Sequence, residues 1–201
     1  KIRGDENMII NFDSKKKIDE KDQLIIGSII QDAFWEKMKW YFSKVSKEEA
    51  TLLIAKAITY NIGYYYKDND EILGAALLSK SGVPHLNIGK GIRKKIGFWK
   101  AFLLKTLFTM SPRNEETLCL QMIAVNPIAR GKGIGKKMLD YLDDFTRKEG
   151  FKQVVLDVID NNEGAIKLYK REGYFVTKHM KTKLFTHGMG FDGIFIMKKT
   201  Y

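Results

Sequence analysis

The chain has 201 residues, of which 44% are hydrophobic and 29% are charged. This composition is that of a folded globular protein and excludes an intrinsically disordered one, and the length favours a single domain over residues 1–201. Lys and Arg outnumber Asp and Glu by 35 to 24, a net charge of +11. Such an excess favours an anionic partner: a nucleotide phosphate, nucleic acid, an acidic lipid or an acidic substrate.

Three features that the sequence lacks indicate the cellular compartment of the protein. A lone cysteine, Cys119, excludes an internal disulfide. No apolar run approaches the roughly 18 residues of a membrane span, so we expect no transmembrane segment. The first residues show no secretory signal pattern. Together these features predict a cytoplasmic protein.

The first part of the chain alternates helical and extended patterns. Residues 8–12 predict a short strand, and apolar residues recurring at threes and fours predict a helix over 21–42. A second helix is expected over 46–60, where Ser46 and Glu49 form a capping box. Two strands follow at 62–67 and 72–79, and the sequence KDNDE between them suits the tight turn of a hairpin.

The segment 82–114 is basic and aromatic. Residues 82–95 read as a loop, and residues 96–110 read as an amphipathic helix closed by Ser111-Pro112. Three interpretations are open: a lid over a substrate cleft, a surface helix that touches acidic lipid, or a helix that covers the core. The third is favoured, because covering helices are the commonest of the three.

The remaining elements alternate regularly. A strand at 116–125 leads through a glycine-rich turn into a helix at 133–148, with Gly150 at its C′ position. A strand at 152–158 and a helix at 163–171 precede two final strands near 174–180 and 192–198. Helices alternate with strands, but hairpin-like pairs intrude, so the fold class is α/β with a mixed sheet.

The turn in residues 121–135, QMIAVNPIARGKGIG, has the form of a phosphate-binding site. A Walker loop is excluded because Gly133 follows Gly131-Lys132 where Ser or Thr is required. The dinucleotide fingerprint is weak because Lys136 replaces its third glycine. The remaining pattern lets backbone N–H groups converge at a helix N-terminus, which suits a pyrophosphate; the alternative is a turn that only packs helix on sheet.

Two motifs together resemble a known family. The sequence AVNPIARGKGIGKKML is similar to the acetyl-CoA-binding motif of the GNAT superfamily of N-acetyltransferases, Arg/Gln-x-x-Gly-x-Gly/Ala. Residues 162–174 resemble the second signature of that family, Asn-x-x-Ala-x-x-x-Tyr-x-x-x-Gly-Phe/Tyr. The close match covers about residues 116–176. It implies a GNAT fold: a mixed central sheet of about seven strands, flanked by helices and splayed at a cofactor cleft.

The resemblance also implies how the chain would hold acetyl-CoA. A bulge before the turn would expose the backbone of Ile123, Ala124 and Val125 to the pantetheine arm, although the same triplet also suits a core strand. Asn162 would contact the arm, with helix capping as its alternative role. The other expected cofactor-binding residues, in and after the turn, are Arg130, Gly131, Lys132, Gly133, Ile134, Gly135, Lys136 and Tyr169.

The implied reaction is direct attack of a primary amine, of a small molecule or peptide, on the acetyl thioester. Tyr169 matches the general acid that protonates the departing thiolate, and its pKa near 10 lies close to that of an alkyl thiol. A plain structural tyrosine is the alternative. The resemblance places the general base at Glu116 or Asp157, no motif chooses between them, and a solvated carboxylate at a strand end is the alternative for each. His85, His179 and His187 lack ligand-like spacing, so we expect no metal.

The acceptor site is placed only by analogy with the family. The resemblance implies contributions from Phe34, Trp35 and Trp40, from the segment 82–114 and from residues 181–191. The same fold with another acyl donor, or an acyl-CoA sensor, is an open alternative. A basic nucleic-acid-binding module is disfavoured because the aromatic residues cluster in apolar runs, so no nucleic acid is expected. A homodimer is possible, since dimers are common in the family.

Overall fold

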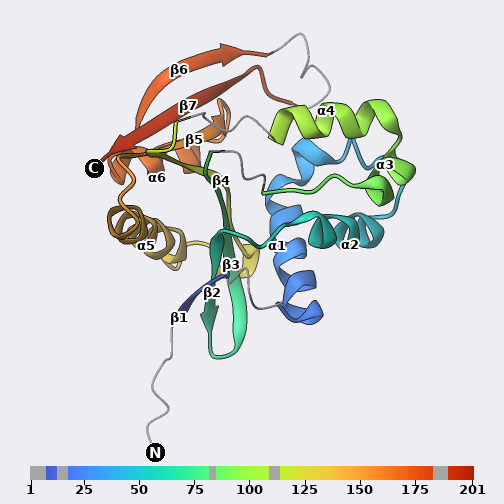
Figure 1. Ribbon diagram of the computed structural model, residues 1–201, viewed down its shortest axis with the longest axis horizontal. Helices are drawn as coiled ribbons and strands as arrows, with labels where there is room; N and C mark the ends of the chain where they lie inside the picture. Colours follow the sequence, from blue (N-terminus) through green and yellow to red (C-terminus); the bar gives the residue numbers. More distant parts are fainter. Residues whose placement is uncertain (1–7, 13–17, 82–84, 109–113, 183–189) are drawn as a thin grey trace, which may run out of the picture.

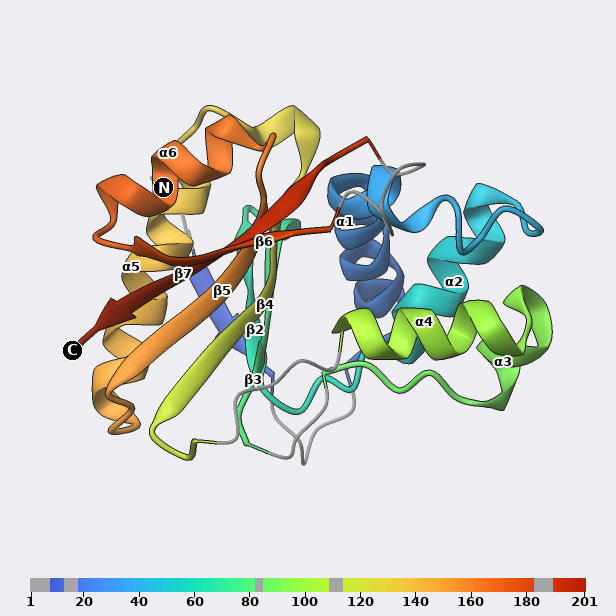
Figure 2. The same ribbon diagram turned by 90° about the horizontal axis from the view of Figure 1, so that it is seen from above.

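A seven-stranded sheet lies between two layers of helices (Figures 1 and 2). The computed structural model describes residues 8–12, 18–81, 85–108, 114–182 and 190–201. The elements in chain order are β1 (Met8–Asn11), α1 (Glu20–Met38), α2 (Lys47–Ala57), β2 (Gly63–Asp68), β3 (Glu71–Ser79), α3 (Lys90–Ile96), α4 (Phe98–Phe108), β4 (Thr117–Val125), the 3-10 helix η1 (Pro127–Ala129), α5 (Ile134–Lys148), β5 (Gln153–Ile159), α6 (Glu163–Arg171), β6 (Phe175–Lys181) and β7 (Gly193–Thr200).

The strand order is β1-β2-β3-β4-β5-β7-β6, and the sheet is mixed. Strands β4 and β5 pair in parallel, whereas the other neighbouring strands of the described sheet pair antiparallel. The parallel pair needs a crossover, which α5 supplies. The predicted fold class, a mixed sheet of about seven strands flanked by helices, is confirmed.

The sheet splays open in its middle. Strand β5 pairs with β4 only from Thr117 to Leu120, although β4 continues to Val125. At the same point the register between β3 and β4 shifts, because Leu77 lies opposite Met122 and Leu78 lies opposite Leu120. Gln121 is therefore the extra residue of a β-bulge, which bends β4 away from β5.

The bulge also changes which layer each β4 side chain enters. Before it, Leu118 and Leu120 pack into the core cluster shared with α5 and α6. After it, Met122 and Ala124 pack into the cluster under α1 to α4. Without the extra residue, strict alternation would keep these even-numbered side chains on one face. The bulge thus lets both layers be filled by a single strand.

Two glycines set how closely helices approach their neighbours. A Cβ at Gly27 of α1 would lie 2.7 Å from the Cβ of Ala55 in α2. A Cβ at Gly74 of β3 would lie 2.7 Å from the sulfur of Met138, through which α5 contacts the sheet. At both places a larger side chain would separate the layers.

The two helices predicted in the N-terminal part of the chain are present, and both end earlier than predicted. Helix α1 is capped by Asp19 and ends at Met38, before the predicted 42. Helix α2 begins after the predicted cap, where the Ser46 side chain accepts a hydrogen bond from the Glu49 backbone N–H at 3.1 Å. It ends before the predicted 60, because Ile58 is extended and forms a β-bridge with Leu86.

The segment 82–114 differs from its prediction. Residues 90–96 are helical as α3 rather than loop, because Ile92 and Ile96, four positions apart, are both buried. Gly97, with φ of 90°, separates α3 from α4, which begins two residues later than the predicted helix. Residues 82–84 and 109–113 of this segment lie outside the described residues. None of the described helices has both the length and the apolar content that crossing a membrane requires.

Candidate active site

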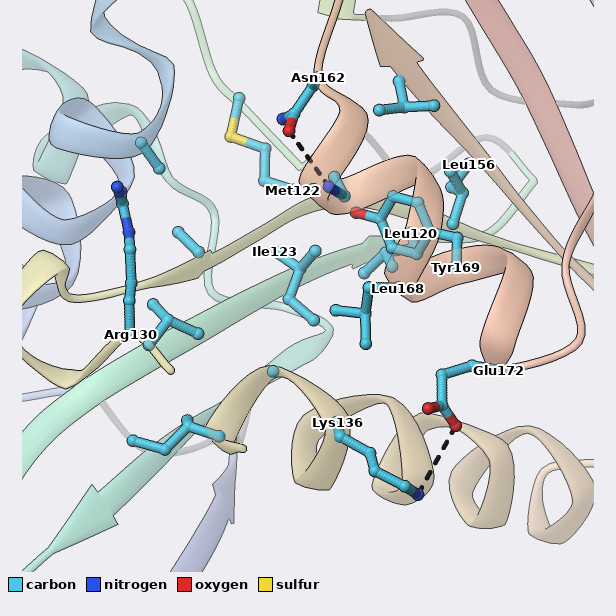
Figure 3. Close-up of a pocket in the computed structure, with 18 of the residues that line it drawn as sticks. Leu120, Met122, Ile123, Arg130, Lys136, Leu156, Asn162, Leu168, Tyr169 and Glu172 are labelled. Atoms are coloured by element: carbon cyan, nitrogen blue, oxygen red, sulfur yellow. Dashed lines mark hydrogen bonds and ion pairs between the residues drawn. The ribbon is translucent and has the colours of Figure 1, made fainter. Parts of the chain in front are cut away.

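A cleft of about 920 Å³ lies where β4 and β5 separate (Figure 3). Its walls come from α1, the second half of β4, the glycine turn with the start of α5, the end of β5, and α6. The lining residues are Ala33, Phe34, Glu36, Leu120, Gln121, Met122, Ile123, Ala124, Val125, Ala129, Arg130, Gly131, Gly133, Ile134, Gly135, Lys136, Leu156, Asp157, Val158, Ile159, Asn162, Gly164, Ala165, Leu168, Tyr169, Arg171 and Glu172.

One wall is a strand edge that β5 does not cover. Ile123, Ala124 and Val125 pair with β3 on one side, and β5 has already separated from β4 at Leu120. Their opposite edge therefore faces the cleft with backbone groups that β5 leaves unpaired. Gln121 is anchored at the start of this edge, where its side-chain amide donates to the Ser79 hydroxyl at 2.7 Å. The wall can accept an extended polar chain as an additional strand.

The glycine turn leads from this strand into α5. Gly131 and Gly133 both have φ of 77°, a left-handed conformation that favours glycine. A Cβ built on either residue would meet no atom within 4 Å, so the space above the turn is open. Gly133 caps α5 without a side-chain hydrogen bond, and no acidic residue lies in the first turn. The helix N-terminus thus presents N–H groups and positive potential to the cleft.

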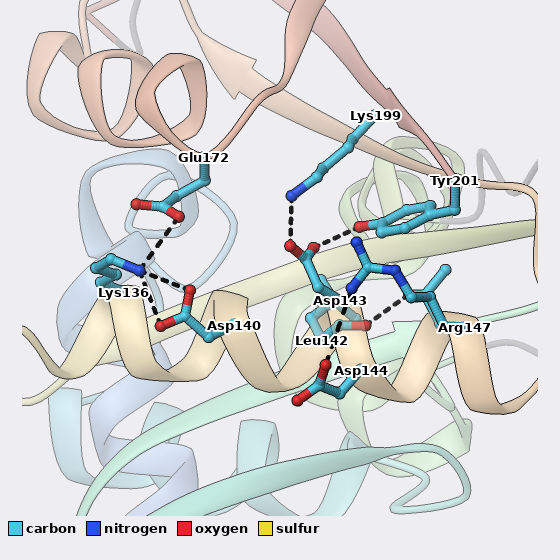
Figure 4. Close-up of polar contacts among 10 residues, drawn as sticks. Lys136, Asp140, Leu142, Asp143, Asp144, Arg147, Glu172, Lys199 and Tyr201 are labelled. Atoms are coloured by element: carbon cyan, nitrogen blue, oxygen red, sulfur yellow. Dashed lines mark hydrogen bonds and ion pairs between the residues drawn. The ribbon is translucent and has the colours of Figure 1, made fainter.

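The basic residues around the turn are placed differently from one another. Arg130 lines the cleft, whereas Lys132 is exposed and lies outside the lining. The Lys136 ammonium lies 2.7 Å from an Asp140 oxygen and 3.6 Å from a Glu172 oxygen (Figure 4). These carboxylates raise the pKa of Lys136. Its charge is thus shared with two acidic groups, and Arg130 is the better placed counter-charge for an anion.

Tyr169 lines the cleft from α6. It is 7% exposed, and its ring centroid lies 5.8 Å from that of Tyr174. Burial raises the pKa of the Tyr169 phenol well above its ordinary value. In Figure 3 its hydroxyl points toward the side of the cleft lined by Met122 and Asn162. The phenol is therefore protonated at neutral pH.

Asn162 begins α6 and lines the cleft at the same time. Its side-chain oxygen accepts a hydrogen bond from the Ala165 backbone N–H at 3.2 Å, so the capping role considered from sequence is present. The cap uses the amide oxygen, and the amide nitrogen can still donate to a ligand. The two roles are therefore compatible in one side chain.

The structure separates the two carboxylates expected as general base. Asp157 is the first β5 residue beyond the paired segment, lines the cleft and lies opposite the bulge at Gln121. Glu116 precedes β4 and is exposed outside the lining, and its backbone carbonyl accepts from Lys152. Four residues of strand, about 14 Å, lie between Glu116 and the point where β4 and β5 separate. Only Asp157 has the position that the role requires.

Cys119 lies close to Asp157 and is not a nucleophile. It is buried at 5% exposure in β4, as expected for a strand residue. Burial, and secondarily the charge of Asp157, raise the pKa of its thiol to about 12. The thiolate is therefore scarce at neutral pH.

The three aromatic residues expected at the acceptor site lie in different surroundings. Phe34 lines the cleft together with Glu36, whereas Trp35 packs against the core and lies outside the lining. Trp40 lies beyond the helix end, where the Lys100 ammonium sits 4.7 Å from its ring centroid. Of the C-terminal segment 181–191, residues 183–189 lie outside the described residues. Phe34 alone of the three aromatic candidates borders the cleft.

Several lining residues were missed from sequence. Glu36, Gln121, Arg171 and Glu172 carry the charged or polar side chains among them. Gln121 had a detectable signal, since a polar residue interrupts an otherwise apolar strand at the position of the bulge. Glu36 and Glu172 carried none, because helix-surface carboxylates are common. No cluster of His, Cys, Asp and Glu capable of binding a metal ion occurs in the described ranges, which omit His187.

The fold and cleft define an α/β protein with a splayed mixed sheet and a glycine turn that opens onto the splay. The model of the acetyltransferase (GNAT) family matches residues 29–174, which is most of the chain. The chain belongs to this family.

Individual relatives agree with this membership. N-alpha-acetyltransferase 30 of Saccharomyces cerevisiae is 27% identical over 123 residues, and streptothricin acetyltransferase of Streptomyces lavendulae is 37% identical over 60 residues. These matches cover 60% and 30% of the chain, and the chain spans 61% and 32% of these two relatives. A GNAT family acetyltransferase from Elizabethkingia anophelis, solved with acetyl-CoA bound, shares the fold with a TM-score of 0.57 at 16% identity, covering 97% of this chain and 98% of its own.

Proposed function

We propose that the protein is an acetyl-CoA-dependent N-acetyltransferase that acts on a primary amine of a small molecule or peptide. One observation carries the proposal: the unpaired edge of β4 runs directly into the open glycine turn within a single cleft. An extended amide-containing arm that ends in a pyrophosphate fits this combination of strand edge and helix N-terminus.

The cleft residues suit separate parts of such a ligand. The backbone of Ile123 to Val125 would pair with the pantetheine amides, and the N–H groups from Gly131 onward would receive the pyrophosphate near Arg130. The acetyl-CoA bound to the related structure from Elizabethkingia anophelis supports this choice of ligand. One relative is named as an N-alpha-acetyltransferase and the other as a streptothricin acetyltransferase, which supports an amine acceptor.

The proposed chemistry needs three proton transfers. The acceptor ammonium must lose a proton before its nitrogen attacks the thioester carbonyl, and Asp157 is positioned to take it. As the new C–N bond forms, the C–S bond breaks and the thiolate leaves. Tyr169 would donate its phenolic proton to that sulfur, and the proton that the new amide nitrogen must lose would restore the phenol. A carboxylate on β5 and a phenol on α6 thus border the cleft in which the acetyl group would be transferred.

Isothermal titration with acetyl-CoA tests the site. Gly133→Glu places a carboxylate where the pyrophosphate should bind, and we expect at least about a tenfold loss of affinity. Gly150→Glu is the matched control: both glycines have φ of 77° and open surroundings, but Gly150 lies at the far end of α5. Equal affinity in the two variants would remove the turn from the proposal.

A turnover assay separates catalysis from binding alone. Release of free thiol from acetyl-CoA is followed with a panel of polyamines, aminoglycosides, amino acids and peptide N-termini. Release that depends on one class of amine supports a transferase and names its acceptor. Tight binding with no release for any amine would instead indicate an acyl-CoA sensor. The homodimer and the cytoplasmic location stay predictions.

A further inference from the structure

The positive charge of the chain is concentrated in one segment. Residues 72–114 contain eight Lys or Arg and no Asp or Glu, so this segment holds eight of the eleven net positive charges. Its helices, α3 and α4, form the edge of the molecule farthest from α5 and α6 (Figures 1 and 2). Neither helix lines the cleft. The concentration of charge therefore has no explanation in the proposed acetyl transfer.

Helix α4 is apolar on both faces. Ala101 and Leu104 are buried and belong to the core cluster under α1. On the outer face, Phe98, Trp99 and Phe102 are 58%, 74% and 54% exposed. At about 100° per residue these three side chains occupy a continuous arc of about 100°. Among the described side chains of α4, Ala101 and Leu104 pack into the core, and the exposed aromatic arc takes no part in that core.

The exposed cations of α3 adjoin this arc. Lys95 forms an ion pair with Glu49 at 2.6 Å, and Lys100 donates to the Trp40 carbonyl at 2.7 Å. Lys90, Arg93 and Lys94 are exposed on the preceding helix. Arg93 and Lys94 lie five and four residues before Phe98, across the turn at Gly97. Cations and large aromatic side chains therefore occur together at one edge.

We propose that Lys90, Arg93, Lys94, Phe98, Trp99 and Phe102 form a docking surface for an anionic lipid bilayer, here called the α3–α4 surface. Indole and phenyl rings favour the level of the lipid headgroups, and nearby Lys and Arg are attracted to anionic lipids. A convex helix face that carries three aromatic residues can insert between headgroups. Binding of a nucleic-acid backbone would need no such apolar arc, so the aromatic residues favour lipid. The attachment is peripheral and would place the protein at the membrane surface.

Vesicle sedimentation tests the charge of the α3–α4 surface. The protein is expected to sediment with phosphatidylcholine vesicles that contain phosphatidylglycerol and not with phosphatidylcholine alone. The double variant Arg93→Glu and Lys94→Glu should lose at least about tenfold in partitioning. Lys148→Glu with Lys152→Glu makes the same change in net charge on exposed residues at the far end of α5 and should bind as the original protein does. No sedimentation, or equal losses in both double variants, would overturn the proposal.

Trp99 gives a second, independent measurement. Brominated phosphatidylglycerol vesicles should quench its fluorescence, and the quenching should be lost in Trp99→Phe but kept in Trp40→Phe. Trp99→Ser should also lower partitioning by about tenfold, because a large exposed ring no longer leaves water. Tighter binding to single-stranded RNA than to anionic vesicles, or a dimer that Trp99→Ser dissociates, would assign the α3–α4 surface to another partner and overturn the lipid proposal.

Discussion

At the scale of single residues, burial changes how Tyr169 can act. The sequence argument rested on the closeness of an ordinary phenol pKa to that of an alkyl thiol. The structure raises the pKa of Tyr169 by burial, so the phenol remains protonated at neutral pH. The same apolar surroundings would also raise the pKa of a thiol that leaves beside it, since burial disfavours both anions. The two pKa values would therefore stay matched, and in the proposed mechanism Tyr169 would act only as a proton donor.

The variant Tyr169→Phe should lower kcat about a hundredfold or more, because a positioned general acid contributes about 10² to 10⁴ in rate. The dissociation constant of acetyl-CoA should change little, since the ring and its packing remain. Steady-state kinetics and titration calorimetry check both quantities. Tyr174→Phe removes one hydroxyl from the adjacent ring outside the cleft lining and serves as the control. A kcat unchanged in Tyr169→Phe would remove this residue as the acid.

The two carboxylates can be compared in the same way. Asp157→Asn should lower kcat/KM by about a hundredfold near neutral pH, and raising the pH should recover part of the loss as the acceptor amine deprotonates by itself. Glu116→Gln should leave the pH–rate profile unchanged, because Glu116 lies outside the cleft lining. Profiles of kcat/KM against pH for both variants show which carboxylate acts as the general base. Loss of activity in Glu116→Gln alone would contradict the assignment.

At the scale of elements, the turn before α5 depends on glycines for different reasons. Gly131 has φ of 77° and open surroundings, so backbone conformation alone requires glycine there. Gly135 has no positive φ, and a Cβ there would lie 3.4 Å from a Leu168 methyl group, an ordinary contact. One glycine permits the shape of the turn, whereas the other leaves room between α5 and α6.

Alanine substitution should therefore have opposite effects at these positions. Gly131→Ala should lower the free energy of unfolding by about 1 to 2 kcal/mol, the cost of a left-handed alanine. Gly135→Ala should raise it by about 0.5 to 1 kcal/mol, because alanine restricts the unfolded chain and favours the helix. Urea unfolding of both variants measures the difference. Equal destabilisation would mean that packing, not φ, governs both sites.

At the scale of the whole molecule, α5 is tied to both halves of the sheet by buried tyrosines and an ion pair. The Tyr64 hydroxyl of β2 donates to the Met138 carbonyl at 2.6 Å. At the other side, Lys199 and Tyr201 from the chain end both contact the Asp143 carboxylate (Figure 4). Helix α5 thus holds together the two parts of the sheet that separate at the cleft.

These buried tyrosines predict a loss of stability in alkali. Burial raises the pKa values of Tyr64, Tyr169 and Tyr174 above the ordinary value near 10. The folded state therefore keeps protons that the unfolded chain releases. The free energy of unfolding should be insensitive to these groups below pH 10 and should fall above it, by about 1.4 kcal/mol per pH unit for each tyrosine.

Urea unfolding between about pH 8 and 11, a range that spans the ordinary tyrosine pKa of about 10, tests the predicted fall in the free energy of unfolding. Tyr174→Phe should reduce the slope above pH 10 by one such increment and leave the slope below it unchanged. Stability that rises above pH 10, or a slope that this substitution does not alter, would contradict the assignment to buried phenols.

The sequence was a good guide to elements with strong periodicity and caps. Local patterns predicted the extent of α5, the Ser46 cap and the hairpin turn at Asn69-Asp70. Each of these features depends mainly on residues that are close together in the sequence. The helix α3 was missed because it has only seven residues, contains Gly91 and is flanked by Gly89 and Gly97. Its stability comes from burying Ile92 and Ile96 against other elements.

The sequence by itself determined the family motifs, the order of strands and helices apart from α3, and the conformation of the glycine turn, because these depend on short-range spacing and backbone preference. The tertiary structure decided which residues share the cleft. Asp157 and Gln121 meet at the splay because β4 and β5 part after Leu120, and Glu116 is excluded because it lies before the paired segment. It also decided that the aromatic residues of α4 face outward, since which face of an apolar helix is buried depends on what packs against it.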